Sequence, residues 1–220
     1  THPSFNNVDA SAGTAINIDS VSTSTGMVFN RVTSGTVSTN AAGDGIAINN
    51  LSGAGTFSAG TVTVRDTGGA AIALSANSAA IDFGSVSIIN PGVAGINVDG
   101  ANTGGVTFAD VDITLNTANS IGVELNGATI DTGNLVMTDL DIIRGAGLPT
   151  GTTGIDLSGT TTTNGAQIIF GDPANSGTDS GATIGTATDA LNQGILFSAT
   201  TDADFIFGDG EQTTDTLSLI

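Results

Sequence analysis

Residues 95–113 read GINVDGANTGGVTFADVDI, and this stretch indicates the fold because both of its halves recur along the chain. The first half is a small residue, an apolar-x-apolar triplet, and then Asn, Asp or Ser. Copies of the triplet begin at Ile16, Ile46, Ile72, Ile96, Val123 and Ile155, with a degenerate copy at Ile195. From Ile16 to Ile155 the spacings are 30, 26, 24, 27 and 32 residues. Internal similarity at such a period is typical of a repeat architecture.

The second half is Phe or Met, two residues, Val or Leu, one residue, and Ile or Val. Its clearest copies begin at Phe83, Phe108 and Met137. Phe29 opens an earlier copy, and Phe57 opens one with a wider gap, which we interpret as a β-bulge. Both halves alternate with a period of two and lie between Gly, Asn, Asp, Ser and Thr residues, so they predict short strands.

Short strands that repeat at this period predict a chain that coils, each coil stacking on the last at about 4.8 Å. Two inward columns are expected, one of Ile16, Ile46, Ile72, Ile96, Val123 and Ile155, the other of Phe29, Phe57, Phe83, Phe108 and Met137. The predicted fold is all-β: a right-handed single-stranded parallel β-helix (β-solenoid) of about seven coils, with 24–32 residues per coil. The hand follows from the chirality of parallel crossovers. The alternative is a β-sandwich.

The coils predict one domain over residues 1–220, interpreted as a fragment of a longer chain. It divides into a lead-in (1–13), regular coils (14–170), a long loop (171–189) and degenerate coils (190–220), with a further long turn at 145–153. A polar column of Asp19, Asn49, Ser75, Asp99, Asn126 and Ser158 predicts a corner, which the glycine following three of them helps to turn. Residues 216–220 end on a strand-like pattern, so we expect the rod to continue into flanking sequence or a neighbouring subunit.

The composition excludes several classes of function. Three basic residues, Arg31, Arg65 and Arg144, face 21 acidic ones, giving a net charge of −18. Nucleic acid is therefore not an expected partner, since its binding depends on Lys and Arg. The chain has no Cys and one histidine, His2, so thiolate or imidazole metal sites and His-activated nucleophiles lack their residues. No apolar run is long enough to insert into a membrane.

The coil pattern GIxI-N/D-G…VTFxDVDI resembles the β-helical repeats of large exported bacterial surface proteins, namely autotransporter passengers and filamentous-haemagglutinin-like adhesins. The resemblance covers roughly residues 14–170 and rests on the style of the repeat. It implies an extracellular or cell-surface location and a non-catalytic role as a structural stalk or adhesin module. The expected partners are flanking solenoid repeats, a second copy of the chain, a surface glycan or a host receptor.

Four aspartates form the best local cluster for chemistry. Asp110 and Asp112 flank the inward Val111, and Asp139 and Asp141 flank the inward Leu140. On adjacent coils the four carboxylates would form a rectangle of about 4.8 Å by 6.5–7 Å. Ca²⁺ prefers such oxygens, so Asp110, Asp112, Asp139 and Asp141 are the candidate calcium site, and no other cofactor is expected. The simpler interpretation is that all four are solvated surface aspartates.

A polysaccharide-degrading enzyme is the alternative function. Two carboxylates suffice for glycoside hydrolysis. Calcium-dependent lyases with this fold use Asp ligands and an Arg base, and Arg144 follows Asp141 by three residues. Against both stand the lack of Trp and Tyr for stacking on sugars and the strongly acidic charge, which repels anionic polysaccharide. We therefore expect no enzymatic activity.

Overall fold

The computed structural model describes residues 6–36, 43–145, 147, 149–171 and 181–207, together with the backbone of 218–219. Within these residues the chain forms strands joined by turns and irregular segments, and no helix. The described part accordingly has no helix of the length and apolarity needed to cross a membrane. The predicted all-β class is confirmed.

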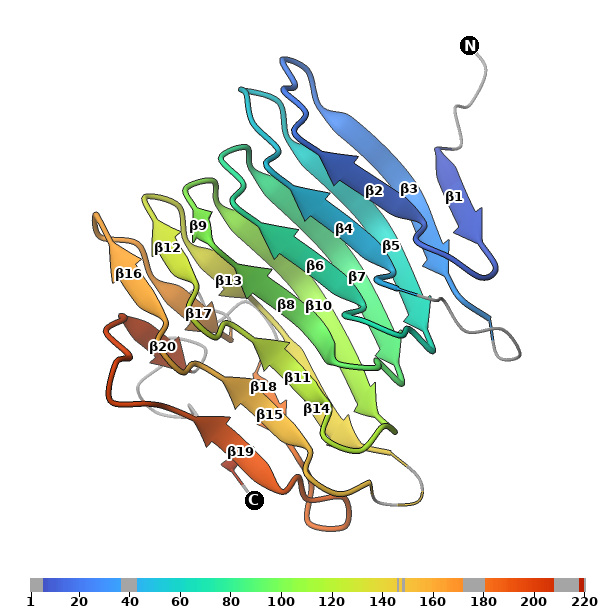
Figure 1. The fold of residues 1–220 in the computed structure, drawn as a ribbon, viewed down its shortest axis with the longest axis vertical. Coiled ribbons are helices and arrows are strands. Elements are labelled where there is room, and N and C mark those ends of the chain that lie inside the picture. Colours follow the sequence, from blue (N-terminus) through green and yellow to red (C-terminus); the bar gives the residue numbers. More distant parts are fainter. Residues whose placement is uncertain are drawn as a thin grey trace.

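The strands form three sheets (Figure 1). Sheet A consists of β1 (Asn7–Ala10), β3 (Met27–Ser34), β5 (Phe57–Arg65), β7 (Ile81–Ile89), β10 (Val106–Leu115), β13 (Leu135–Met137), β14 (Leu140–Arg144), β17 (Ile168–Phe170), β18 (Ala182–Ile184), β20 (Phe205–Phe207) and β21 (Ser218–Leu219). Sheet B consists of β2 (Ile16–Asp19), β4 (Ile46–Asn49), β6 (Ile72–Ser75), β8 (Ala94–Asp99), β11 (Ile121–Glu124), β15 (Thr153–Asp156) and β19 (Gln193–Leu196). Sheet C consists of β9 (Ala101–Asn102), β12 (Thr129–Asp131) and β16 (Thr161–Thr163).

Each repeat contributes a strand to sheet B and then one or two strands to sheet A, and three of the repeats add a strand to sheet C between them. Every strand pair between the described residues is parallel and joins one repeat to the next. Strands of successive repeats therefore lie side by side, as Figure 1 shows. The antiparallel layers of the β-sandwich alternative do not fit this pairing.

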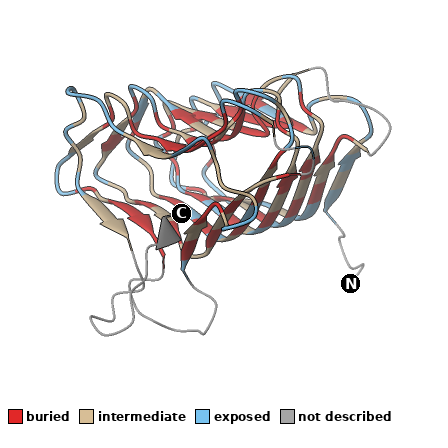
Figure 2. Ribbon diagram, turned by 90° about the horizontal axis from the view of Figure 1, so that it is seen from below, coloured by how far each residue is buried: buried red, intermediate tan, exposed pale blue. Residues whose placement is uncertain are grey.

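The isoleucine column is confirmed along the whole of sheet B. Its members pair in register in the order Ile16, Ile46, Ile72, Ile96, Val123, Ile155 and Ile195. The first six are buried, and Ile46 through Ile155 have no exposed surface at all. In Figure 2 buried residues follow the strands from one end of the stack to the other. One continuous core results, which no single repeat could form alone.

The aromatic column is confirmed in part. On sheet A it reads Phe29, Ala59, Phe83, Phe108, Met137, Phe170 and Phe207. The prediction that Phe57 belongs to it is wrong. Phe57 lies two residues earlier, in the neighbouring column opposite Ile81.

Ala59 explains why Phe57 resembled a member of the aromatic column. Its methyl group leaves space between Phe29 and Phe83, and the Phe57 ring lies beside both, with centroid distances of 5.6 and 5.5 Å. Ala59 itself is 1% exposed and is followed by the same two-residue gap as Phe83. The bulge expected from the wider gap after Phe57 is therefore absent from β5, whose register with β7 is continuous across this point.

The corners after sheet B lie where the polar column predicts them. The residue after each column member has a positive φ between 52° and 77°, and these residues are Ser20, Asn50, Ala76, Gly100, Gly127 and Gly159. Glycine adopts this left-handed backbone without strain, whereas Ala76 does so at a steric cost. The polar column member therefore precedes the left-handed position instead of occupying it.

Two segments that the sequence predicts to be irregular contain strands. β1 lies in the lead-in and pairs with β3. β18 lies within 171–189 and pairs with β14, because its two apolar residues alternate and bury against the core. Residues 1–5, 172–180 and 208–217 lie outside the described residues. Of the turn predicted at 145–153, the described residues 145, 147 and 149–152 belong to no strand, and β15 begins at Thr153.

Candidate functional sites on sheets A and B

The outer face of sheet A carries polar columns that contain three of the four aspartates of the predicted cluster. One column contains Thr61, Ser85 and Asp110, and the next contains Thr63, Ser87, Asp112 and Asp141, all in register. These side chains point outward because they alternate with buried residues such as Val86 and Val111. Strand alternation is thus what brings the aspartates to one surface.

The four predicted aspartates have different surroundings. Asp110 is half-buried and accepts a hydrogen bond of 2.9 Å from the Ser85 hydroxyl. Asp112 lies directly opposite Asp141, and both line a surface hollow of about 300 Å³. Asp139 precedes β14, and its backbone carbonyl accepts a hydrogen bond from the Val111 amide. The structure thus brings Asp112 and Asp141 together at one hollow.

The calcium assignment of these aspartates stays a prediction. Across the described ranges, no three His, Cys, Asp or Glu side chains are grouped so that they could hold a metal ion. A full calcium shell needs six to eight oxygens, which Asp112 and Asp141 alone do not supply.

The arginines differ in their partners. Arg31 pairs with Asp9 at 2.7 Å, and this hydrogen bond lowers the pKa of the Asp9 carboxyl below its ordinary value. Arg65 and Arg144 form no ion pair with any other described residue. The buried Nε of Arg144 has no hydrogen-bond partner among those residues either. All three arginines lie on strands of sheet A, namely β3, β5 and β14.

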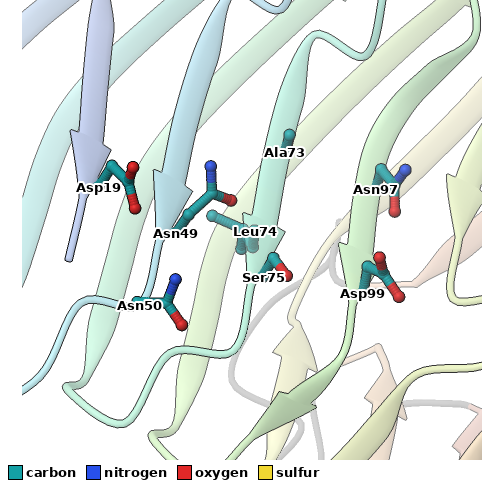
Figure 3. A pocket seen from close by; sticks show the side chains of 8 residues that line it. All are labelled: Asp19, Asn49, Asn50, Ala73, Leu74, Ser75, Asn97 and Asp99. Atoms are coloured by element: carbon teal, nitrogen blue, oxygen red, sulfur yellow. The ribbon is translucent and has the colours of Figure 1, made fainter.

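Sheet B carries a second and larger hollow, the sheet B groove, of about 450 Å³. Its lining consists of Asp19, Asn49, Asn50, Ala73, Leu74, Ser75, Asn97 and Asp99, which come from β2, β4, β6, β8 and the corner after β4. Figure 3 shows these side chains spread across the four neighbouring strands. Ala73 lies in register between Ala47 and Asn97, so two successive strands carry only a methyl group at this outward position. This lack of bulk leaves room for the groove.

Two further carboxylates lie in register on the same sheet, and the sequence analysis missed them. Glu124 on β11 is opposite Asn97 on one side and Asp156 on the other. Asp156 is 7% exposed, and its Oδ1 accepts a hydrogen bond of 2.9 Å from the Ser158 amide. Burial raises the pKa of the half-buried Glu124, and the charges of Asp156 and Asp99 raise it further.

The signal that could have revealed this pair is the middle position of the repeated triplet. Glu124 and Asp156 both occupy the x of apolar-x-apolar, in successive copies. Once the isoleucine column is aligned, that position forms an outward column of its own. The apolar and corner positions alone do not reveal this column.

Comparison with known proteins yields no assignment. No family model, no curated protein and no solved structure matches this chain.

Proposed function

We propose that this chain is a right-handed parallel β-solenoid of about seven coils. It serves as a non-catalytic stalk or adhesin module of a secreted cell-surface protein. Its repeat is like that of autotransporter passengers and filamentous-haemagglutinin-like adhesins. The observation that supports it best is the unbroken isoleucine column of sheet B, buried over successive strands. A core continuous along the stacking direction makes each repeat rigid against the next. Such a structure suits a spacer or a display surface.

The acidic surface fits an extracellular display role. The net charge of −18 opposes side-by-side aggregation of copies and favours solubility, while the strand edges at the ends of the stack remain able to pair. The polar outer columns of sheets A and B present hydroxyl, amide and carboxylate groups to partners outside the cell.

Self-association end to end is part of the proposal. Within the described residues β2 and β19 are the outer strands of sheet B, each hydrogen-bonded on one side. An exposed parallel edge is a template for another strand. Light scattering over a concentration series tests the self-association. A molecular mass that rises with protein concentration supports it, and a constant monomer mass contradicts it.

The second candidate function is a glycan-cleaving enzyme, and the Glu124–Asp156 pair is the observation that favours it. A general acid needs a carboxyl with a raised pKa beside a second carboxylate, and Glu124 has that character. Against it, Asp156 is buried and already bonded to the Ser158 amide, so it is poorly placed to reach a substrate.

Incubation with neutral glycans and with polygalacturonate in calcium-containing buffer separates the two functions. The stalk or adhesin leaves polymer length unchanged. Product release that disappears in Glu124→Gln would establish the enzyme and end the non-catalytic proposal.

A further inference from the structure

The sheet B groove offers hydrogen-bonding groups that the protein itself does not use. Among the described residues, the side-chain amides of Asn49, Asn50 and Asn97 make no hydrogen bond to protein. Each amide provides two donors and one acceptor oxygen, the pattern that neighbouring hydroxyl groups of a sugar satisfy. The Ser75 hydroxyl, on the same lining, adds a further donor and acceptor.

The charge of this face is of one sign. Asp19 and Asp99 lie at the two sides of the groove, on β2 and β8. The three arginines are all on sheet A, so sheet B carries no basic side chain in its described strands. Burial raises the pKa of Glu124 on the next strand most, and the charges of Asp156 and then Asp99 add to it. An anionic ligand is repelled here and a cationic one is attracted.

The spacing of the groove suits a linear ligand that crosses the strands. Asp19, Asn49, Ser75 and Asp99 pair in register, one per strand, so they recur at about 4.8 Å. A chain molecule lying across these strands meets one polar side chain at every step. The groove volume of about 450 Å³ is within the range of known ligand pockets.

We propose that the sheet B groove binds an oligosaccharide that carries amino groups, of the glucosamine type. The ammonium groups bind the carboxylates of Asp19 and Asp99 through charge-assisted hydrogen bonds. The ring hydroxyls bind the amides of Asn49 and Asn97, and the Ala73 methyl packs against the apolar face of a sugar ring. This inference rests on the proposed function as an adhesin module and names the class of ligand that the adhesin binds.

Calorimetric titration of the whole chain with four probes tests the proposal. A short glucosamine oligomer is compared with its N-acetylated form of the same length, with an oligolysine of equal charge, and with an oligogalacturonate. We expect the glucosamine oligomer to bind about tenfold or more tightly than the acetylated form, the value of one charge-assisted hydrogen bond. The oligogalacturonate is expected not to bind. Equal binding of oligolysine would show that charge alone acts, and it would overturn the proposal, as would no binding of the glucosamine oligomer.

Variants locate the binding. Asp99→Asn and Asn97→Ala each remove one groove contact at the surface, and each is expected to weaken glucosamine-oligomer binding about tenfold. Asp82→Asn is the matched control, because it removes one acidic charge from an exposed position on sheet A. Equal weakening in Asp82→Asn would mean that the ligand responds to net charge and not to the groove. Thermal melting of each variant verifies the fold.

Failure here is distinguishable from failure of the proposed function. If no probe binds and no polymer is cleaved, the ligand class is wrong and the stalk remains. If the oligomer binds and is also cleaved, the groove is a ligand site and the non-catalytic function is wrong.

Discussion

Replacing Glu124 by glutamine is expected to stabilise the protein at neutral pH. Glu124 lies directly opposite Asp156, and its carboxylate is also repelled by Asp99. Like charges opposite each other on neighbouring strands cost roughly 0.2–1 kcal/mol. Because Glu124 is half-exposed, solvent screens part of this, and we expect a gain of about 0.5 kcal/mol. For a chain of this size that is an increase of about 1–2 °C in Tm.

The gain depends on pH in a defined direction. The pKa of Glu124 in the folded state is raised above its ordinary value of 4.5, so the charged carboxylate destabilises the fold above that raised pKa. As pH falls through the folded pKa toward 4.5, wild-type Glu124 takes up its proton and this cost is lost. The difference in Tm between Glu124→Gln and wild type should therefore be largest at neutral pH and vanish below the ordinary pKa.

Differential scanning calorimetry of both proteins across this pH range measures the effect. Asp82→Asn is the control for net charge, since Asp82 faces the uncharged Ser58 and Thr107. The reasoning is refuted if Asp82→Asn raises Tm as much as Glu124→Gln. It is also refuted if the gain in Glu124→Gln persists unchanged in acid.

Three further substitutions test the packing and the corners. Ala76→Gly should raise the free energy of unfolding by up to about 1 kcal/mol, because Ala76 has a left-handed backbone with φ 54°. Gly100→Ala should lower it, because Gly100 has φ 64°. Melting curves that shift in the same direction for both variants would contradict this. Phe83→Ala should cost about 3–5 kcal/mol in chemical denaturation, since its ring lies between two others, at 5.5 and 4.8 Å, with no exposed surface; a loss under 1 kcal/mol would mean that the ladder is not packed. Asn77→Ala leaves two backbone groups without the Asn77 side chain as a partner, the Leu51 amide and the Ile48 carbonyl, and should lower the free energy of unfolding by about 1–3 kcal/mol for each. An unchanged denaturation midpoint would show that water replaces the Asn77 side-chain amide.

Much of the fold could be predicted because a strand has a side-chain period of two and stacked repeats share one register. Once Ile72, Ile96 and Val123 are aligned, every other position on those strands is fixed as inward or outward. The outward position of the aspartates that flank Val111 and Leu140 follows from the same alternation. The corners could be predicted because Asn, Asp, Ser and Gly, the residue types that favour turns, gather after each strand of sheet B.

The sequence fails to predict features that depend on a residue's place in the coil and not on its type. Phe57 was matched to the other aromatic residues, although the buried Ala59 holds the equivalent position. Asn77 gives no sign in the sequence that it is 1% exposed and bonded to the backbone of the preceding coil. Its burial depends on a corner whose path only the three-dimensional structure provides.

The candidate sites also divide into those that the sequence reveals and those that it does not. The outward aspartates of sheet A were found because each pair flanks a clear apolar residue. The Glu124–Asp156 pair does not stand out because the middle position of the triplet varies from copy to copy, and only two successive copies carry an acidic residue there. The groove was missed because it depends on the absence of bulk at Ala73 and not on the presence of a motif.

The measurement that tests the account most directly is the distance between spin labels placed along one outward column of sheet B. The chain has no native cysteine, so cysteine introduced at Asn17 can be paired with cysteine at Asn97, Glu124 or Leu196. These positions lie three, four and six strand steps from Asn17, and stacking in register predicts distances of about 14, 19 and 29 Å. Distances that rise in this order at about 4.8 Å per strand would support the stacked solenoid. A distance from Asn17 to Leu196 that is no longer than that to Asn97 would contradict it.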